Sequence, residues 1–372
     1  MKLILKLIIF LLNIIYLVLK LLPTNSKKIL IMSRQSNKKS LDIKLIERSL
    51  RKDYKVVTLC KTLEGRENST FFTKISYGFH MFRQMYHLAT SKVCVLDTYI
   101  PTVSILKHKK SLKIIQMWHS NGTMKKFGYS ALGKREGTTG KYAKIFKMHQ
   151  NYDIILASSN EYKDHLMKGF GLENTDNILV YTLPRFDLLK SKSYEQRIKE
   201  KIYKKYPALK EKENIVYAPT FRKDEQKFEK KLKELIETFN YEKYNLIIKL
   251  HPLSKIKLND ERVIVDNSFS TFDMLFVTDK LISDYSCIIY EAGVRNIPLY
   301  FYAYDLSYYD FIRGIALDYS TLPGFTERYA KELVKDLDKK YDMKYLKEFT
   351  NKYIENTENC TEKIVDLIKE NM

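Results

Sequence analysis

The stretch K-L-I-S-D-Y-S-C-I-I-Y-E-A-G-V-R-N-I-P-L-Y-F-Y, residues 280–302, decides the fold. It opens with the short apolar run Lys280–Ser283 and closes with a second apolar run, Ile297–Tyr302. Pro298 stands near the start of the second run, where a strand tolerates proline. The pattern therefore predicts two buried strands that are joined by a sharp turn and a short helix.

The residues between these strands carry signals for the start and the end of a helix. Asp284 and Ser286 are both good N-cap types, and Gly293 falls where the helix should stop. A parallel strand that feeds a helix N-terminus aims backbone N–H groups outward from the carboxyl edge of the sheet, which makes an anion site. An ordinary βαβ crossover gives the same signals, so the other motifs have to decide between the two interpretations.

The alternation of strands and helices continues over most of the chain. It predicts an α/β fold made of two Rossmann-like, doubly wound lobes with parallel sheets. Helices are expected at Leu41–Arg51, Phe71–Ala89 and Glu161–Lys168. Strands are expected at Lys28–Met32, Val56–Cys60, Val93–Asp97, Ile114–Trp118, Asp153–Ala157 and Ile178–Tyr181, and again at Ile215–Tyr217, Leu246–Leu250, Val263–Val265, Leu281–Ile282 and Leu299–Phe301.

Composition suggests where the lobes begin and end. We expect a membrane-associated helix over residues 1–23, an N-terminal acceptor lobe over 24–190, and a lysine-rich linker over 191–212. The C-terminal, donor-binding lobe is expected over 213–326. Residues 327–372 are charged and lack a strand signal, so they are expected to form helices that pack across the lobes.

The charge of the chain points to an anionic partner. Its 65 Lys and Arg against 44 Asp and Glu give a formal charge of +21, which implies nucleic acid, an anionic membrane surface or a phosphate-rich substrate. No nucleic-acid-binding signature accompanies this charge, so we do not expect a nucleic acid partner. The scattered cysteines Cys60, Cys94, Cys287 and Cys360 show no C-x-x-C spacing, which indicates reduced thiols rather than disulfides or a zinc site.

The N-terminal segment Leu3–Leu22 is almost wholly apolar. Lys2, Lys6, Asn13 and Lys20 fall within about 40° of one another on a helix with about 100° per residue. A narrow polar stripe of this kind is typical of a helix in the membrane interface, with lysines reaching the headgroups. No small-residue cleavage site of a signal peptide follows. The length also suffices to span a bilayer, so the orientation in the membrane stays open, and a buried core helix is the remaining alternative.

Polar and charged motifs follow five of the predicted strands. In a doubly wound sheet, function collects beyond the carboxyl ends of the strands, so these motifs predict one cationic, proton-handling site. They are His119 with Gly122, Lys125 and Lys126; Pro184-Arg185-Phe186-Asp187; Ala218-Pro219-Thr220-Phe221-Arg222; His251-Pro252; and Ser283-Asp284-Tyr285-Ser286.

Transfer of a phosphate group needs these residue types. The negative charge of a diphosphate has to be matched by guanidinium, ammonium and N–H donors. Arg222 offers a bidentate fork, His251 a hydrogen-bond donor, and Ser286 with its helix N-terminus a cradle. A hydroxyl nucleophile also needs a base near neutral pH, for which His119 and His251 are the strand-end candidates. Protein cations can do this work, so we expect neither a metal nor a cofactor.

In this order, the motifs resemble those of the CDP-glycerol glycerophosphotransferase family, enzymes of teichoic acid and related polyol-phosphate polymer synthesis. The resemblance runs from Ile114 to Gly324. It rests on W-H-S-N-G-T-M-K-K-F-G (118–128), S-S-N-E-Y (158–162), L-P-R-F-D (183–187), Y-A-P-T-F-R (217–222), K-L-H-P (249–252), S-D-Y-S-C-I-I-Y-E (283–291), F-Y-A-Y-D (301–305), and R-G with P-G (313–314 and 323–324).

The resemblance implies a GT-B fold with the active site between its lobes. It also implies transfer of glycerol-phosphate or ribitol-phosphate from a CDP-activated donor to a hydroxyl of an undecaprenyl-diphosphate-linked saccharide, with release of CMP, on the cytoplasmic face of the cell membrane. By similarity, His119 and His251 are catalytic; Arg222, Thr220, His251, Ser283, Ser286 and Cys287 bind the donor diphosphate; Glu291 and Pro219 bind the ribose or nucleotide; Gly122, Lys125, Lys126 and Arg185 bind acceptor or phosphate; and Asp284 and Asp305 are structural, with Asp284 capping the helix.

The sequence departs from the family pattern at three places. His119 is followed by Ser-Asn-Gly, where the commoner form is H-G-x-P-x-K, Phe221 replaces a tryptophan, and Cys287 replaces the second serine of a pair. The first departure leaves the choice of acceptor open, and the last removes one hydroxyl from the diphosphate site.

Two alternatives remain at this level. A nucleotide-sugar glycosyltransferase of cell-surface polysaccharide synthesis can use the same fold, and a basic protein can bind anionic polymer without catalysis. The donor polyol, priming against polymerisation, and a homo-oligomeric state are also left open.

Overall fold

The computed structural model describes residues 2–62 and 71–372. Contacts divide the chain into two compact units, and the stretch predicted to be a linker, 191–212, lies inside the second of them. The C-terminal part of the chain is divided between the two units, because residues up to 354 belong to the second unit and residues 355–372 to the first. The first unit holds residues 1–121, 127–187 and 355–372, and the second holds 122–126 and 188–354.

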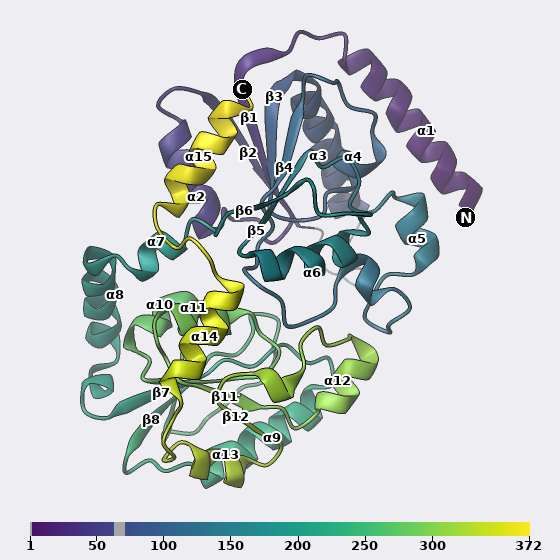
Figure 1. Cartoon of the computed structure of the whole chain (residues 1–372). Coiled ribbons are helices and arrows are strands. Elements are labelled where there is room, and N and C mark those ends of the chain that lie inside the picture. The colour runs from purple at the N-terminus through teal and green to yellow at the C-terminus, as the bar shows by residue number, and fades with distance from the viewer. Residues whose placement is uncertain (1, 63–70) are drawn as a thin grey trace. The chain divides into compact units, whose positions relative to one another are not determined.

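The first unit is built on a parallel sheet of six strands in the order β2-β1-β3-β4-β5-β6 (Figure 1). Its strands are β1 (Asn25–Ser33), β2 (Lys55–Cys60), β3 (Ser91–Leu96), β4 (Lys113–Gln116), β5 (Ile154–Ala157) and β6 (Ile178–Val180). Its helices are α1 (Lys2–Leu19), α2 (Leu41–Leu50), α3 (Phe71–Thr90), α4 (Pro101–Ile105), η1 (Gly128–Ala131), α5 (Gly140–Ile145), α6 (Asn160–Phe170) and α15 (Cys360–Glu370). The short helix α7 (Phe186–Leu189) runs from the first unit into the second.

Both faces of this sheet are covered, which explains why its strands are apolar on both sides. Along β1, Ile29 and Ile31 pack into a cluster with α2 and α15. The alternate residues Leu30 and Met32 pack into a second cluster with α3, α4 and α6. The predicted doubly wound arrangement of this unit is confirmed.

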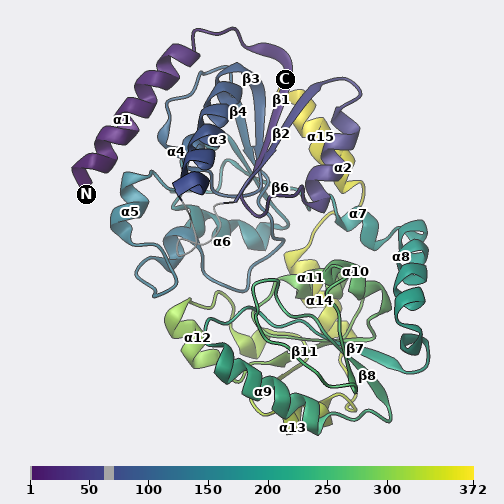
Figure 2. The same cartoon turned by 180° about the vertical axis from the view of Figure 1, so that it is seen from behind.

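The second unit repeats the design with the strand order β12-β11-β10-β7-β8-β9, again all parallel (Figure 2). One face of the sheet carries α9 and α13, which share a hydrophobic cluster with the strands. Its strands are β7 (Glu213–Tyr217), β8 (Tyr244–Ile248), β9 (Val263–Val265), β10 (Lys280–Ser283), β11 (Leu299–Tyr302) and β12 (Phe325–Glu327). Its helices are α8 (Lys192–Lys205), η2 (Pro207–Lys210), α9 (Glu225–Thr238), α10 (Thr271–Met274), η3 (Leu275–Val277), α11 (Ile288–Val294), α12 (Leu306–Ile312), η4 (Tyr319–Thr321), α13 (Ala330–Asp336) and α14 (Met343–Tyr353).

The strand–helix–strand prediction for residues 280–302 is confirmed as β10–α11–β11. Of the two predicted N-cap residues, Ser286 accepts the N–H of Ile288, the first residue of α11, whereas the prediction for Asp284 is wrong. The N-cap of α11 is Cys287, and Asp284 does not cap this helix because its carboxylate is used elsewhere. Gly293 lies inside α11 instead of ending it. A Cβ atom at Gly293 would clash with Thr350 of α14, so glycine is needed there for close helix packing. The turn with positive φ comes later, at Asn296.

Several strand bounds differ from the predicted ones. β4 ends at Gln116 and β8 at Ile248, each two residues before the predicted end. β12 was not predicted at all, because it is only three residues long and half-buried at the edge of its sheet, which leaves little apolar signal.

The predicted N-terminal apolar helix is present as α1. Within residues 2–62 and 71–372, it is the single helix that is long and apolar enough to cross a membrane. Unlike a core helix, it has few buried side chains, of which Tyr16 is the fully buried one.

Candidate active site

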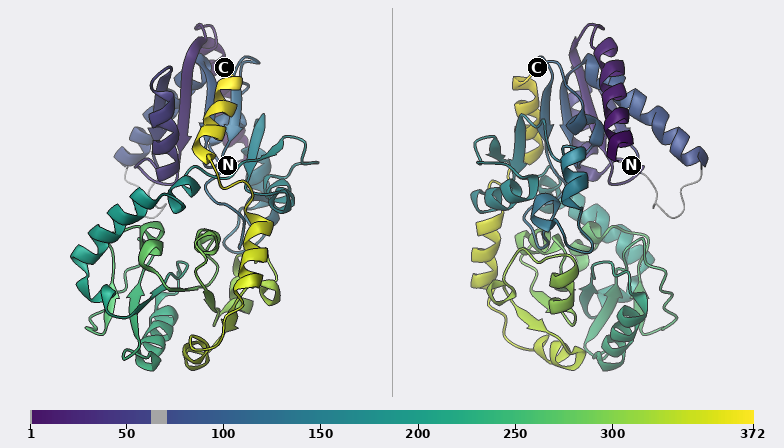
Figure 3. Two further views of the ribbon diagram at one scale, coloured as in Figure 1. Left: turned by 60° about the vertical axis from the view of Figure 1, so that its left-hand side comes forward. Right: turned by 90° about the vertical axis from the view of Figure 1, so that its right-hand side faces the viewer.

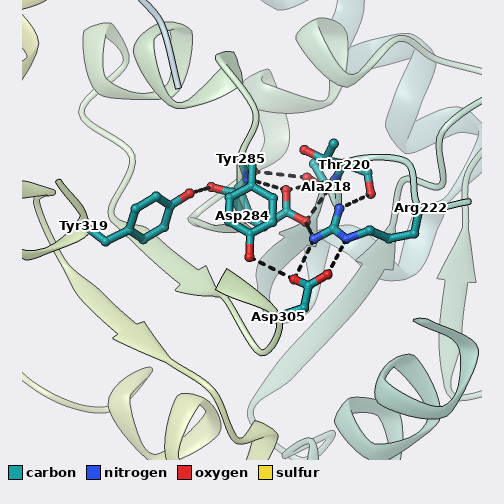
Figure 4. Close-up of polar contacts among 8 residues, drawn as sticks. Ala218, Thr220, Arg222, Asp284, Tyr285, Asp305 and Tyr319 are labelled. Carbon is teal, nitrogen blue, oxygen red and sulfur yellow. Dashed lines mark hydrogen bonds and ion pairs between the residues drawn. The ribbon is translucent and has the colours of Figure 1, made fainter. Parts of the chain in front are cut away.

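Arg222 is the centre of a buried ion cluster beyond the carboxyl ends of β7, β10 and β11 (Figure 4). Its Nε donates to Asp305 Oδ2 at 2.8 Å, and its Nη2 donates to Asp305 Oδ1 at 3.1 Å and to Asp284 Oδ2 at 2.9 Å. Its Nη1 donates to the carbonyl of Thr220 at 2.7 Å, and Asp284 accepts the backbone N–H of Thr220 at 2.9 Å. The four bonds that Arg222 itself donates use four of the five N–H groups of its guanidinium. The cluster therefore ties three strand ends together.

Tyrosines enclose this cluster. The rings of Tyr285 and Tyr309 stack with 4.0 Å between centroids, and each lies 4.8 Å from the guanidinium of Arg222. Tyr319 donates its hydroxyl to the carbonyl of Asp284 at 2.6 Å. Although burial acts to lower the pKa of Arg222, the two carboxylates raise it above its ordinary value. Arg222 is therefore a permanent cation in a site shielded from water.

The ion cluster is not an anion site by itself, because one arginine faces two aspartates and the formal charge is +1 − 2 = −1. Lys125 supplies the next cation. Burial lowers the pKa of Lys125, while the negative charge of Asp284 acts in the opposite direction. Arg313, whose charge also acts on Lys125, was not among the predicted site residues. Its signal was the R-G motif at 313–314, but no chemical feature of that motif indicated a place near Lys125.

Lys125 reaches this site because its loop, residues 122–126, belongs to the second unit. The loop pairs antiparallel with residues 314–316, and Tyr290 of α11 donates its hydroxyl to the carbonyl of Thr123 at 2.8 Å. Gly122 has φ +65°, and a Cβ atom there would run into the Tyr290 ring. Gly122 therefore serves the close approach of this loop to α11.

His251 is an exposed residue just beyond β8. Its Nδ1 accepts the backbone N–H of Leu253 at 3.2 Å, which leaves Nε2 to carry the proton of the neutral ring. Partial desolvation and, after it, the charge of Lys125 lower the pKa of His251. The ring of Phe221, which replaces the family's tryptophan, lies 5.4 Å from the imidazole. A neutral His251 can thus donate one hydrogen bond from Nε2.

Replacing Lys125 by methionine is expected to raise the pKa of His251, because a positive charge that disfavours the imidazolium is removed. The measurement is a histidine NMR titration in which H251Q identifies the resonance. K126M, which changes the neighbouring lysine of the same loop, is the matched control and should leave the titration unchanged. Equal titration curves in K125M and the wild type would contradict the placement of Lys125 near His251.

The hydroxyl groups that were predicted to bind the donor diphosphate differ in their hydrogen bonds. The buried Ser283 Oγ donates to the carbonyl of Ala218 at 3.1 Å, and Ser286 Oγ accepts the N–H of Ile288 at 3.4 Å. The Oγ1 atom of Thr220 is buried and has no hydrogen-bond partner among the residues that the structure describes. A buried hydroxyl without a partner is uncommon in proteins, so Thr220 is the hydroxyl best placed to meet a substrate.

Three other residues that were predicted for the donor site lie at α11 or in the loop after β7. Cys287, at the start of α11, approaches the carbonyl of Gly122 with its thiol at 3.8 Å. Glu291 is buried in α11 and Pro219 is buried in the loop after β7. The roles assigned to Glu291 and Pro219 by resemblance stay predictions.

His119 belongs to the first unit and is exposed. Its Nδ1 lies 2.9 Å from the carbonyl oxygen of Asp97. A carbonyl can only accept, so Nδ1 carries the proton and Nε2 keeps its lone pair, as a general base requires. Just before it, Trp118 has φ +63°, and its N–H is held by Gln116 Oε1 at 3.0 Å. This turn ends β4 early and exposes the imidazole.

Arg185 supports the same loop. Its Nη1 donates to Asp42 Oδ2 at 2.6 Å, its backbone N–H donates to Asp42 Oδ1 at 2.9 Å, and its Nη2 reaches the carbonyl of His119 at 3.3 Å. Asp42 lies in the first turn of α2. It was not predicted as a site residue, because no local pattern indicates its pairing with Arg185. Arg185, predicted to bind acceptor or phosphate, is thus held beside the candidate base.

Lys249 is a second residue whose use was missed. Its ammonium group is buried and donates to Asp266 Oδ2 at 2.6 Å and to the carbonyls of Asp266 at 2.7 Å and Phe269 at 2.6 Å. These bonds fasten the chain two residues before His251 to the loop after β9. The K-L-H-P motif therefore contains one structural lysine and one candidate site histidine.

Comparison with known proteins identifies the family and the fold of this chain. The family model described as CDP-Glycerol:Poly(glycerophosphate) glycerophosphotransferase matches residues 14–370. The chain is 31% identical to the teichoic acid ribitol-phosphate primase of Bacillus spizizenii over 299 residues, which cover 78% of this chain and 76% of that protein. It is 29% identical to the teichoic acid glycerol-phosphate primase of Bacillus subtilis over 299 residues, with the same coverages. Its fold matches the structure of the wall teichoic acid polymerase TagF with a TM-score of 0.73, at 22% identity over 93% of this chain and 89% of that one.

Proposed function

Because this chain belongs to the CDP-glycerol:poly(glycerophosphate) glycerophosphotransferase family, we propose that it transfers a polyol phosphate from a CDP-activated donor to a hydroxyl of a lipid-linked acceptor in teichoic acid synthesis. One observation in the second unit carries the donor half of this proposal. The loop that carries Lys125 is fastened in the second unit by its pairing with Ile315 and by the hydrogen bond from Tyr290 to Thr123, and there the charge of Lys125 lowers the pKa of His251 while the charge of Asp284 acts to raise the pKa of Lys125. Cationic and hydrogen-bonding groups from three loops therefore meet at one edge of this sheet, as a diphosphate requires.

The contacts divide the donor-site residues into two kinds. Lys125, the Nε2–H of His251 and the Thr220 hydroxyl are the groups proposed to touch the donor phosphates. Arg222 and Asp284 hold the loop that carries Thr220, since most donors of the guanidinium are already used inside the protein. Arg222 is therefore proposed as a positioning residue with at most one N–H left for a phosphate.

On the acceptor side, His119 is proposed as the general base. Its Nε2 takes the proton of the acceptor hydroxyl while that oxygen forms a bond to the β-phosphorus of the CDP-polyol. The bond between this phosphorus and the bridging oxygen breaks, and the electron pair leaves with CMP. Lys125 and His251 stabilise the charge that develops on the leaving phosphate.

We propose that this reaction uses protein cations rather than a metal. Among the described residues, no group of three or more His, Cys, Asp and Glu side chains is arranged to hold a metal ion. The donor phosphates would instead be met by the ammonium and imidazole groups named above.

The proposed setting is the cytoplasmic face of the cell membrane. The basic surface of the chain suits anionic lipid, and α1 offers an apolar attachment. An undecaprenyl-diphosphate-linked saccharide is the proposed acceptor, and CDP-glycerol and CDP-ribitol are the proposed donors.

The test is an assay of the purified full chain with a synthetic lipid-diphosphate disaccharide. We expect acceptor-dependent release of CMP from CDP-glycerol or CDP-ribitol, an acceptor heavier by polyol phosphate, and no turnover of UDP-sugars. A chelator should leave the rate unchanged. Turnover of a UDP-sugar in place of both CDP-polyols would establish the glycosyltransferase alternative, and the length of the product would separate priming from polymerisation.

A further inference from the structure

The loops after β1, β3 and β4 lie together at the carboxyl edge of the first sheet. These strands are neighbours in the sheet (Figure 3), and the strand order reverses here, because β2 lies on one side of β1 and β3 on the other. Open α/β sheets bind ligands at such a reversal point. Neighbouring strands lie about 4.8 Å apart, so the three loops begin within about 10 Å of one another. The loops after β1 and β3 carry none of the side chains that are proposed above to touch a substrate.

Each of the three loops holds one buried polar atom that has no hydrogen-bond partner among the described residues. These atoms are Nε of Arg34, Oδ1 of Asp97 and Nδ2 of Asn121. Two further atoms of this kind in the first unit, on His87 and Ser91, belong to the opposite edge, where β3 begins. A buried polar atom without a partner is costly and uncommon in proteins. Three of them in adjacent loops therefore indicate a site whose ligand supplies the hydrogen bonds.

Arg34 is the cation at this edge of the sheet. Thr98 Oγ1 accepts its backbone N–H at 3.0 Å, and Nη1 donates to the carbonyl of Tyr99 at 3.3 Å. The half-buried side chain forms no ion pair within residues 2–62 and 71–372. It uses one of its five N–H groups, whereas Arg222 uses four inside the protein. A guanidinium with unused donors suits a phosphate group, which it can bind through two parallel hydrogen bonds.

Asp97 places an acceptor of hydrogen bonds beside the candidate base. Its backbone carbonyl holds Nδ1 of His119 at 2.9 Å, and its side chain is only 2% exposed. Burial raises the pKa of Asp97 to about 6, although the nearby hydroxyls of Ser33 and Thr98 act to lower it. The carboxyl group is therefore mostly ionised at neutral pH, and an ionised carboxylate only accepts hydrogen bonds. Its partner has to be a donor, such as a hydroxyl group of a ligand.

Asn121 adds a hydrogen-bond donor two residues after His119. Its Oδ1 accepts the backbone N–H of Leu183 at 3.3 Å. Because a backbone N–H can only donate, this contact fixes which end of the amide faces Leu183, and Nδ2 is the end without a partner. Asn121 belongs to the Ser-Asn-Gly stretch at which the sequence departs from the commoner family pattern. The departure thus brings a donor to the edge that carries the candidate base.

We propose that Arg34, Asp97 and Asn121 form the subsite for the reacting end of the acceptor, and that this end is a polyol attached through a phosphodiester. Arg34 binds the phosphate, and Oδ1 of Asp97 accepts a hydrogen bond from the hydroxyl next to the reacting one. Nδ2 of Asn121 donates to an oxygen of the same polyol phosphate. In a bare disaccharide acceptor the lipid diphosphate lies two sugar rings from the reacting hydroxyl, whereas this phosphodiester is separated from it only by the polyol carbons.

This assignment rests on the proposed transfer reaction and adds the chemistry of its acceptor. It implies that an earlier transfer of a polyol phosphate to the lipid-linked saccharide supplies the acceptor of this enzyme. The phosphate that Arg34 binds could otherwise belong to the lipid diphosphate, so the experiments compare acceptors with and without a polyol phosphate end.

The first test measures binding without turnover. The probe is glycerophosphoglycerol, a phosphodiester with glycerol at both ends, titrated calorimetrically into the full chain with excess CMP to fill the donor site. R34M should weaken binding by about tenfold or more, because a charged contact with the phosphate is lost, and R34K should restore part of the affinity. R48M, which removes an exposed arginine of α2 in the same unit, is the matched control. No binding by the wild type, or equal binding by R34M, would overturn the subsite.

The second test compares the kcat/KM values of lipid-diphosphate disaccharides that end in glycerol phosphate, in propane-1,3-diol phosphate or in the bare sugar. The propanediol end keeps a primary hydroxyl but lacks its neighbour. R34M should reduce the preference for the glycerol phosphate end over the bare sugar by about tenfold. D97N should reduce the preference for glycerol over propanediol by about fivefold, because a neutral acceptor binds a hydroxyl less strongly than a charged one.

The outcomes separate this subsite from the proposed function. Undiminished preferences in R34M and D97N would overturn the subsite while the transfer reaction stands. An equal loss of turnover by R34M with the bare and the glycerol-ended acceptors would assign Arg34 to the lipid diphosphate and overturn the polyol phosphate assignment. Probe binding that R34M weakens, together with no CMP release from any acceptor, would support the subsite and contradict the transfer reaction.

Discussion

H119A is expected to slow CMP release by about 10²–10⁴-fold, the usual contribution of a general base, without unfolding the protein. The reason lies in the tautomer. Nδ1 of His119 donates to the carbonyl of Asp97, so Nε2 is the ring nitrogen that carries the lone pair and can take the proton of the acceptor hydroxyl. The measurement is acceptor-dependent CMP release as a function of pH. The wild-type rate should fall on the acid side, where the imidazole is protonated, and this limb should be missing in H119A.

Three further observations make this result specific. Donor affinity should be preserved in H119A, since the base acts on the acceptor. Added imidazole should restore part of the rate. H165Q on α6 replaces a half-buried histidine of the same unit and serves as the matched control, which should retain wild-type turnover. Full turnover by a folded H119A would remove His119 from the chemistry.

Local pattern was sufficient to predict the fold. Residues 280–302 read as two apolar runs around a short helix, and they fold as β10–α11–β11. The apolar alternation of β1 likewise divides between two helical layers, as a buried parallel strand requires. These features are dictated by residues near one another in the chain, so a single sequence contains their signal.

What the sequence missed are pairings between distant residues. Asp284 has the composition of a helix cap, yet its carboxylate is taken by Arg222 and by the backbone of Thr220, 64 residues away. Gly293 resembles a helix stop, yet it is glycine because Thr350 packs against it. In both cases a tertiary partner overrides the local preference, and such a partner cannot be read from spacing.

The candidate site likewise combines features that local sequence predicts with pairings that it does not predict. The strand-end motifs correctly brought Arg222 and Asp284 together, because parallel strands end at a common edge. Asp305, which also pairs with Arg222, was assigned to the site only by the resemblance to the family. That Lys125 joins them follows from the membership of loop 122–126 in the second unit, which depends on its pairing with residues 314–316. No sequence signal announces that pairing.

R222M is expected to lower the free energy of unfolding of the second unit by about 3–5 kcal/mol, the cost of leaving buried charges without their partner. Asp284 and Asp305 are both buried, and each forms an ion pair with this guanidinium. Chemical denaturation with hydrogen exchange at residues 217–222 and 283–285 measures the loss and locates it. The control is R262Q, since Arg262 pairs with Glu237 and Asp260 on the surface and its loss should leave the melting transition unchanged.

Stability alone does not tell whether Arg222 positions the loop or binds the diphosphate itself, but D305N separates the two roles. This variant keeps the shape of the side chain and removes one of the charges that hold the guanidinium. If Arg222 acts by fastening Thr220 and Asp284, D305N weakens the cluster, so the KM for the CDP-polyol rises as stability falls. If Arg222 is instead a direct ligand, D305N frees N–H groups and makes the cluster less negative, so the KM falls. Four of the guanidinium's hydrogen bonds already end on protein atoms, and for that reason the rise is the expected result.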